Sequence, residues 1–249
     1  MSSENSAGES VRRKLSYGLA VLLLAGCSAS TAAVETPKKV EPAQAVVRAP
    51  VVMMLGDSYT AGIKGVEPEA TYAGDLARKL GWQVIIGGYR GTGFLSRGMI
   101  GKNFARLFTD QLSWRPAPDM VMIVGGHNDA TRRNPMNGLN EAVYQLLNTV
   151  KGRWPTTKIV LVGPMWGGDA PQNAFLVRDV MKSVADQMQV PFVDPLAEQW
   201  ISGDVSRGTG NADLYIRRDE THPNEAGNAY FADKLVAALS RLGLNQPNK

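Results

Sequence analysis

Cysteine and histidine are nearly absent from this chain of 249 residues. Cys27 is the single cysteine, and His127 and His222 are the only two histidines. A single cysteine excludes an intrachain disulfide framework and any zinc or iron–sulfur site built from several cysteines. Two histidines exclude a histidine-rich metal centre. The sequence therefore predicts no bound metal.

Dense basic runs and long apolar runs are also missing. Lysine and arginine number 27 against 23 for aspartate and glutamate, so the net charge is +4, and no Lys/Arg run exceeds three residues. Nucleic-acid-binding proteins usually show a denser basic patch, so we expect no nucleic-acid partner. The 44% of hydrophobic and 20% of charged residues are ordinary for a globular protein. The length allows one large domain or two small ones.

The first 27 residues have the pattern of an export signal. A basic patch at residues 12–14 precedes an uncharged, mostly apolar run over residues 15–25. This run is shorter than the roughly 20 residues of a transmembrane helix, and the pattern is typical of a secretory signal peptide. It ends in Leu24-Ala25-Gly26-Cys27, which resembles the lipobox of bacterial lipoproteins. We predict a signal peptide over residues 1–26 and a lipid on Cys27; the alternative is a plain signal peptide with an incidental cysteine.

The segment after Cys27 has the composition of a linker. Residues 28 to about 48 are rich in Ala, Ser, Thr, Pro and Glu and contain no aromatic residue, so they cannot bury enough apolar surface to order themselves. We predict a flexible tether over residues 27–49 and a domain over residues 50–249. We expect a monomer that is exported and anchored to the cell envelope, or secreted if Cys27 carries no lipid.

Within the domain, apolar runs alternate with amphipathic segments. Most of the apolar runs end at glycine, which suits strands that are buried on both faces. The predicted strands cover residues 51–55, 84–86, 120–124, 159–162 and 192–193. The predicted helices cover residues 71–80, 104–114, 139–150, 174–188 and 224–242. This alternation predicts an α/β fold, with a parallel sheet covered by helices on both faces and ligands outside the carboxyl ends of the strands.

Two segments contain candidate groups for nucleophilic catalysis. Ser58, in Gly56-Asp57-Ser58, follows the first predicted strand at the start of a helical turn, where free N–H groups point outward. The alternative is a serine that only caps a helix. Asp219 precedes His222 by three residues, so it can accept the Nδ1 proton and leave Nε2 free for a serine. The alternative is a histidine that only caps a helix.

Two further segments contain candidate hydrogen-bond donors for a negatively charged oxygen. Residues 87–93 hold four glycines, which permit close backbone approach, although an ordinary tight turn explains them as well. Asn128 follows the third predicted strand, and its amide is a neutral donor for an oxyanion. Asparagine is also a common turn residue. Each of the four segments is weak evidence when taken alone.

Taken together and in this order, the four segments resemble the SGNH hydrolases, also called the GDSL esterase/lipase family. Gly56-Asp57-Ser58 matches the family's serine block, Gly126-His127-Asn128-Asp129 its asparagine block, and Asp219 with His222 its final block. The second block departs in its flanking residues; Gly91 matches best, and Gly93 is the alternative register. The resemblance covers essentially all of residues 50–243.

The resemblance implies a flavodoxin-like, three-layer α/β/α sandwich with a central parallel sheet of about five strands. It also implies a serine esterase with the catalytic residues Ser58, Asp219 and His222, an oxyanion hole formed by Ser58, Gly91 and Asn128, and no cofactor. The expected substrate is a short acyl ester, of the acetyl type, on a glycan or lipid of the cell envelope or its surroundings. The alternatives are an acyltransferase that uses the same acyl-enzyme and a non-catalytic, surface-tethered binding lipoprotein.

Overall fold

Five parallel strands form the centre of the part of the chain that the structure, a computed structural model, describes: residues 48–248. The strands are β1 (Val51–Gly56), β2 (Gln83–Gly88), β3 (Met120–Val124), β4 (Lys158–Val162) and β5 (Phe192–Val193). The predicted signal peptide, Cys27 and nearly all of the predicted tether lie outside the described residues. Among residues 48–248, no helix is both long enough and apolar enough to cross a membrane.

The strands lie in the order β2-β1-β3-β4-β5, and every neighbouring pair is parallel. This is the strand order of flavodoxin-like folds, in which ligands bind where the order reverses at the carboxyl edge. In the register of the sheet, Gly56 at the end of β1 lies beside Gly88 of β2 and Val124 of β3. The loops that follow these three strands therefore begin side by side.

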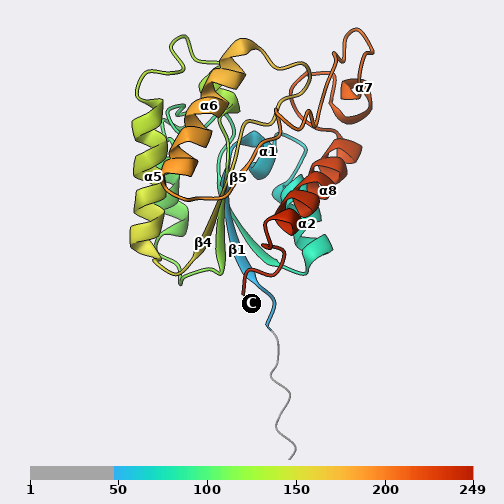
Figure 1. Ribbon diagram of the computed structural model, residues 1–249. Coiled ribbons are helices and arrows are strands. Elements are labelled where there is room, and N and C mark those ends of the chain that lie inside the picture. Colours follow the sequence, from blue (N-terminus) through green and yellow to red (C-terminus); the bar gives the residue numbers. More distant parts are fainter. Residues whose placement is uncertain (1–47, 249) are drawn as a thin grey trace, which may run out of the picture. The chain divides into compact units, whose positions relative to one another are not determined.

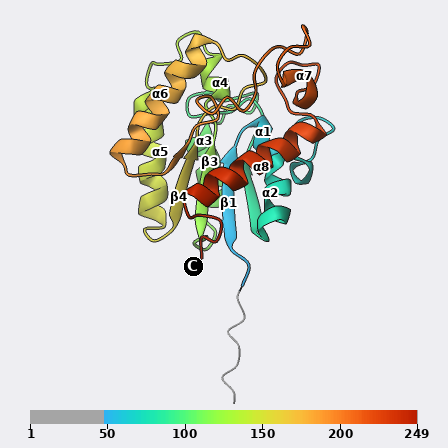
Figure 2. The ribbon, with the colours of Figure 1, turned by 45° about the vertical axis from the view of Figure 1, so that its right-hand side comes forward.

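Helices cover both faces of the sheet (Figures 1 and 2). One face packs against α3 (Phe104–Leu107), α5 (Leu139–Arg153) and α6 (Gln172–Gln187), and the other against α2 (Tyr72–Leu80) and α8 (Glu225–Arg241). The predicted three-layer α/β fold is confirmed. The long helices and all five strands lie where the sequence predicted them, within a few residues at each end.

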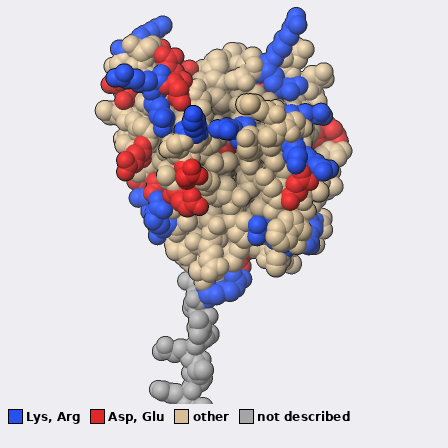
Figure 3. Space-filling model, turned by 180° about the vertical axis from the view of Figure 1, so that it is seen from behind, with Lys and Arg blue, Asp and Glu red and all other residues tan. Residues whose placement is uncertain are grey.

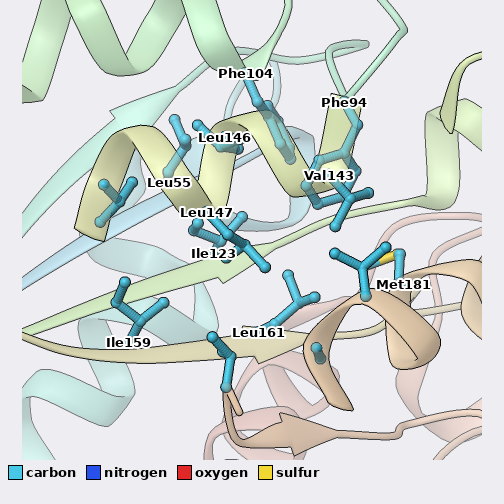
Figure 4. Close-up of a cluster of buried hydrophobic side chains, with 14 of the residues drawn as sticks. Leu55, Phe94, Phe104, Ile123, Val143, Leu146, Leu147, Ile159, Leu161 and Met181 are labelled. Carbon is cyan, nitrogen blue, oxygen red and sulfur yellow. The ribbon is translucent and has the colours of Figure 1, made fainter. Parts of the chain in front are cut away.

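The hydrophobic core is divided by the sheet into two halves. Side chains of successive strand residues point to opposite faces, so Met53 and Leu55 of β1 pack under α3, α5 and α6, whereas Val52 and Met54 pack under α2 and α8. Figure 4 shows Leu55, Phe94, Phe104, Ile123, Val143 and neighbouring apolar side chains of the first half packed together. Burial on both faces explains why the strands are apolar without alternation.

The structure also contains short helices, of which the sequence indicated only the helical turn that begins at Ser58, because a single turn shows no periodic pattern. They are α1 (Ser58–Ala61), η1 (Pro68–Ala70), α4 (His127–Ala130) and α7 (Ala212–Tyr215). The predicted helix over residues 104–114 instead divides into α3 and a π-helical turn, η2 (Phe108–Leu112). Two of the short helices, α1 and α4, directly follow strands at the carboxyl edge of the sheet and carry candidate site residues.

Candidate active site

Ser58 is the first residue of α1, directly beyond the carboxyl end of β1. Asp57 is the N-cap, and its Oδ1 accepts a hydrogen bond of 3.0 Å from the N–H of Tyr59. The capping alternative for Ser58 is therefore wrong, because its neighbour performs that role. The Ser58 residue is 8% exposed, and its N–H makes no hydrogen bond within residues 48–248. Its hydroxyl and its N–H are both available to a ligand.

The structure brings Ser58, His222 and Asp219 together in one hydrogen-bonded chain. Ser58 Oγ lies 2.9 Å from His222 Nε2, and His222 Nδ1 lies 2.9 Å from Asp219 Oδ2. The serine and the histidine are 164 positions apart in the chain, so only the tertiary fold makes this contact. Such a chain lets the imidazole accept the serine proton while the carboxylate holds the ring in one tautomer.

The Asp219 carboxylate is held in a turn by backbone donors as well as by the imidazole. Its Oδ1 accepts hydrogen bonds from the N–H of Thr221 at 3.0 Å and from that of His222 at 2.9 Å. Partial burial acts to raise the pKa of Asp219, but the hydrogen bonds from His222 and Thr221 outweigh it and leave this pKa below its ordinary value. Asp219 is therefore anionic at neutral pH.

Tyr59 contacts this turn from α1, a role that the sequence did not reveal. Its hydroxyl donates a hydrogen bond of 2.5 Å to the carbonyl oxygen of Thr221, and its ring centroid lies 5.7 Å from that of His222. The side chain is buried. The residue after the candidate nucleophile thus ties α1 to the turn that carries the imidazole. Only the adjacency of an aromatic residue to Ser58 hints at this in the sequence.

The Asn128 side chain lies between the loops that follow β1 and β2. Its Nδ2 donates to Asp57 Oδ2 at 3.2 Å and to the carbonyl oxygen of Thr92 at 3.0 Å. An amide nitrogen has two hydrogens, so both donors are occupied within the protein. For Asn128 to hold a substrate oxygen, one of these two bonds must be exchanged for the new one.

Gly91 and Gly93 differ in whether their backbone N–H is free. The Gly93 N–H donates to the carbonyl oxygen of Ser96 at 2.9 Å, and a Cβ on Gly93 would lie only 2.4 Å from Asp129 Oδ2. The Gly91 N–H makes no hydrogen bond within residues 48–248, and its φ of +74° is one that glycine adopts readily. Of the two, Gly91 therefore has the available donor.

Two buried carboxyl groups hold the loops around Ser58. Asp129 accepts three backbone hydrogen bonds, from the N–H groups of Phe94, Leu95 and Ser96, at 2.8–2.9 Å. Asp57 is 2% exposed, and burial raises its pKa to about 7. These contacts attach the loop after β2 to the segment after β3.

His127 lies against the ring of Tyr59, which also contacts His222, and against Trp166. Its Nδ1 lies 3.2 Å from the carbonyl oxygen of Met165, and its ring packs 4.3 Å from Trp166 and 5.4 Å from Tyr59, between ring centroids. Burial lowers the pKa of His127 to about 4. The imidazole is therefore neutral at pH 7, and it takes no part in the hydrogen-bonded chain of Ser58.

A cavity of about 390 Å³ lies next to the turn that carries His222. Its walls come from the loop after β4, from the segment between β5 and α7, and from Glu220 in the turn. They include an indole, three carboxylates, a guanidinium and a hydroxyl, from Trp166, Asp169, Asp204, Arg207, Thr209 and Glu220. Glu220, which lies between Asp219 and His222 in the turn, is one of the residues that line this cavity.

Comparison with known proteins matches this chain to one family. The sequence model of the GDSL-like lipase/acylhydrolase family matches residues 54–230. A GDSL lipase of Mycobacterium tuberculosis is 28% identical over 219 residues, which cover 82% of this chain and 87% of the lipase.

Solved structures with the same fold include two carbohydrate esterases. A family two carbohydrate esterase from Clostridium thermocellum aligns with a TM-score of 0.59 at 20% identity, over 79% of this chain and 66% of the esterase. A carbohydrate acetylesterase from Sinorhizobium meliloti aligns with a TM-score of 0.55 at 19% identity, over 78% of this chain and 99% of the acetylesterase. At these identities, the likeness establishes the fold alone.

Proposed function

This chain belongs to the GDSL-like lipase/acylhydrolase family and is a carboxylic ester hydrolase. We propose that Ser58 is its nucleophile and that His222 and Asp219 complete the catalytic triad. The observation that carries this assignment is the hydrogen-bonded chain from Ser58 Oγ through both ring nitrogens of His222 to Asp219. The non-catalytic alternative from the sequence is disfavoured, because none of these groups is lost or misplaced.

The reaction proceeds through an acyl-enzyme. His222 Nε2 takes the proton of Ser58 as Oγ attacks the ester carbonyl carbon, and Asp219 stabilises the imidazolium that forms. The intermediate collapses with cleavage of the ester C–O bond, and His222 returns the proton to the departing alcohol. A water molecule, deprotonated by His222, then attacks the acyl carbon. Ser58 leaves with the proton, and the carboxylic acid is released.

The oxyanion is held by the N–H groups of Ser58 and Gly91 and by the Asn128 amide. Two observations support this set. Both backbone N–H groups lack a partner within residues 48–248, whereas that of Gly93 is engaged. The Asn128 amide already lies beside the loops of β1 and β2, and its contact to Asp57 is the longer of its two hydrogen bonds. We expect the oxyanion to replace this longer bond.

The substrate is a short acyl ester, of the acetyl type, on a sugar-containing molecule. The cavity lined by Glu220 of the catalytic turn offers Trp166 as a flat apolar surface and carboxylate, guanidinium and hydroxyl groups as hydrogen-bond partners, which suits the alcohol part of such an ester. The fold is shared with carbohydrate esterases. Transfer of the acyl group to a second sugar hydroxyl uses the same acyl-enzyme, and it is the alternative outcome.

Replacement of Ser58 by alanine tests the catalytic assignment. Ser58→Ala removes one hydroxyl, so we expect the fold to persist while hydrolysis of p-nitrophenyl acetate falls by a factor of about 10³ or more. A fluorophosphonate probe, which loses fluoride when a serine oxygen attacks its phosphorus, should label the wild type and not the variant. Ser183→Ala, on the exposed face of α6, is the matched control. Undiminished labelling of Ser58→Ala would place the nucleophile elsewhere.

The acyl preference and the acceptor are measured separately. With p-nitrophenyl esters of increasing chain length, we expect kcat/KM to be highest for acetate and to fall as the chain grows. Adding an acceptor sugar distinguishes the two reactions, because hydrolysis yields free acetate and transfer yields an acetylated sugar. A maximum at eight or more carbons would contradict the proposed acyl size.

A further inference from the structure

The loops after β2 and β3 carry arginines without ion pairs. We define the rim as six residues of these loops: Arg90, Arg97, Met99, Ile100, Arg132 and Arg133. All six are exposed, and none of the four arginines forms an ion pair within residues 48–248. Residues 89–103 and 131–138 contain no aspartate or glutamate at all. The rim is therefore a region of uncompensated positive charge.

The cations directly behind the rim, and several others in the described part of the chain, are paired with carboxylates. Lys102 and Arg106, just behind the rim, share the carboxylate of Asp110. Arg178 pairs with Asp194, and Arg48, Lys79 and Arg241 have carboxylate partners of their own. Figure 3 shows Lys and Arg side chains along the upper edge of the domain, where the strands end. The rim thus differs from its immediate neighbours Lys102 and Arg106 in having no carboxylate partner within residues 48–248.

An exposed apolar pair lies among these arginines. Met99 is 94% exposed and Ile100 is 37% exposed, and they stand between Gly98 and Gly101, both with positive φ. An isolated exposed hydrophobic residue needs no explanation. A methionine and an isoleucine held together at a loop tip, with arginines around them, form the pattern of a segment that enters the boundary between lipid headgroups and acyl chains.

The rim is attached to the predicted oxyanion loop. A Cβ on Gly91 would lie 3.4 Å from Gly98 Cα. The backbones of Arg97 and Thr92 form an isolated antiparallel β-bridge, and the carbonyl oxygen of Thr92 accepts a hydrogen bond from Asn128. Arg132 Nη1 approaches the carbonyl oxygen of Leu95 at 3.5 Å, which joins the second loop to the first. Whatever binds the rim therefore lies directly beside the candidate site.

We propose that the rim docks the domain onto an anionic phospholipid surface, with Met99 and Ile100 entering the headgroup region and the arginines facing lipid phosphates. Charge complementarity selects an anionic partner, and the apolar pair selects a lipid surface over a soluble polyanion. The docking brings Ser58 to the surface at which membrane-associated esters are presented. It is independent of the proposed chemistry, since no member of the triad belongs to the rim.

A fluorescent label at the loop tip tests the contact directly. Cys27 is the only cysteine, so Met99→Cys in the full chain carrying Cys27→Ser gives one attachment point for an environment-sensitive dye. The matched control is Gln187→Cys, exposed at the end of α6 and on the opposite edge of the sheet. We expect vesicles of phosphatidylglycerol and phosphatidylcholine in equal parts to shift the emission of the dye at position 99, but not at position 187. Pure phosphatidylcholine should produce little shift.

Charge removal tests the role of the arginines. Arg97→Ala together with Arg133→Ala should weaken the vesicle affinity at least about tenfold, because each arginine near an anionic surface contributes roughly fivefold. High salt should weaken it as well, while hydrolysis of soluble p-nitrophenyl acetate stays unchanged. No shift at position 99, equal shifts at both positions, or equal shifts with both vesicle types would overturn the proposal. So would an equal shift with polygalacturonate alone, since the rim would then bind polyanions in general. These readouts do not depend on catalysis, so they stand even if Ser58 is not the nucleophile.

Discussion

Asp57 and His127, two buried residues next to the candidate site, have pKa values displaced in opposite directions. Burial raises the pKa of Asp57 from 3.8 to about 7 and lowers that of His127 from 6.5 to about 4. Between pH 4 and 6.5, Asp57 binds a proton more readily in the folded chain than in the unfolded chain. His127 binds one less readily in the folded chain. Acidification therefore favours folding through the carboxyl group and opposes it through the imidazole.

Replacing one of the two groups should leave only the pH dependence of stability that the other group causes. The contribution of Asp57 is present at low pH and lost as the pH rises to about 7, whereas that of His127 is present above pH 6.5 and lost as the pH falls to about 4. Asp57→Asn keeps the helix cap, so we expect its free energy of unfolding to fall between pH 7 and 4.5 by about 2–3 kcal/mol more than that of the wild type. For His127→Gln we expect the opposite slope.

Urea unfolding followed by tryptophan fluorescence at pH 7, 6 and 4.5 measures both slopes. The comparison uses the change with pH of each protein, because each substitution also carries a cost that does not depend on pH. If all three proteins show the same pH dependence, neither group has a displaced pKa in the folded state.

At the scale of elements, the candidate site depends on how closely the loop after β4 packs against the turn that carries His222. A Cβ on Gly167 would lie 2.6 Å from the carbonyl oxygen of Glu220 and 2.8 Å from that of Thr221. These atoms belong to the backbone and cannot rotate away as a side chain would. A larger residue at position 167 must therefore displace the turn between Asp219 and His222.

Gly167→Ala is therefore expected to lower kcat for p-nitrophenyl acetate at least about tenfold, because small displacements of a catalytic group are costly. The far-UV circular dichroism should stay that of the wild type. Gly152→Ala is the matched control, since nothing lies within 4 Å of its Cβ position in α5. There alanine should leave activity unchanged and raise stability by up to about 1 kcal/mol. Equal activity of the two variants would show that the turn tolerates the displacement.

At the scale of the whole molecule, the open prediction concerns how the domain is held in place. Cys27 and the segment that precedes the domain lie outside the described residues, so the lipid on Cys27 remains a proposal from the sequence. A diacylglycerol group supplies two acyl chains, and two chains are what stable attachment to a membrane requires.

Fractionation and mass spectrometry of the N-terminal peptide test this attachment. We expect the wild type to be found with membranes and to begin at a lipid-modified Cys27. Cys27→Ser should leave the membrane fraction in large part, or accumulate unprocessed, while its hydrolysis of a small soluble ester stays at the wild-type rate. An unmodified Cys27, or a chain that still begins at Met1, would contradict the lipoprotein assignment and leave the esterase assignment untouched.

The element order and the identity of the candidate groups were determined by the sequence alone. Strands buried on both faces must be apolar throughout, so runs such as Met120 to Val124 are visible without any tertiary information. The serine, asparagine and histidine blocks lie in loops next to these elements, and their order indicated the family. The short helix α4 was not visible, because a single helical turn has no periodicity to detect; the turn at Ser58 was expected only because it follows a predicted strand.

Only the tertiary structure decided how the candidate groups meet. The 2.9 Å contact between Ser58 and His222 spans 164 positions, and no local pattern encodes a distance between segments so far apart. The sequence also does not show that the N–H of Gly91 is free while that of Gly93 donates to Ser96. Nor does it show that the Asn128 amide already donates to Asp57 and Thr92. Distances, burial and pKa values arise when distant segments pack against one another, whereas residue types and periodicity are properties of the chain itself.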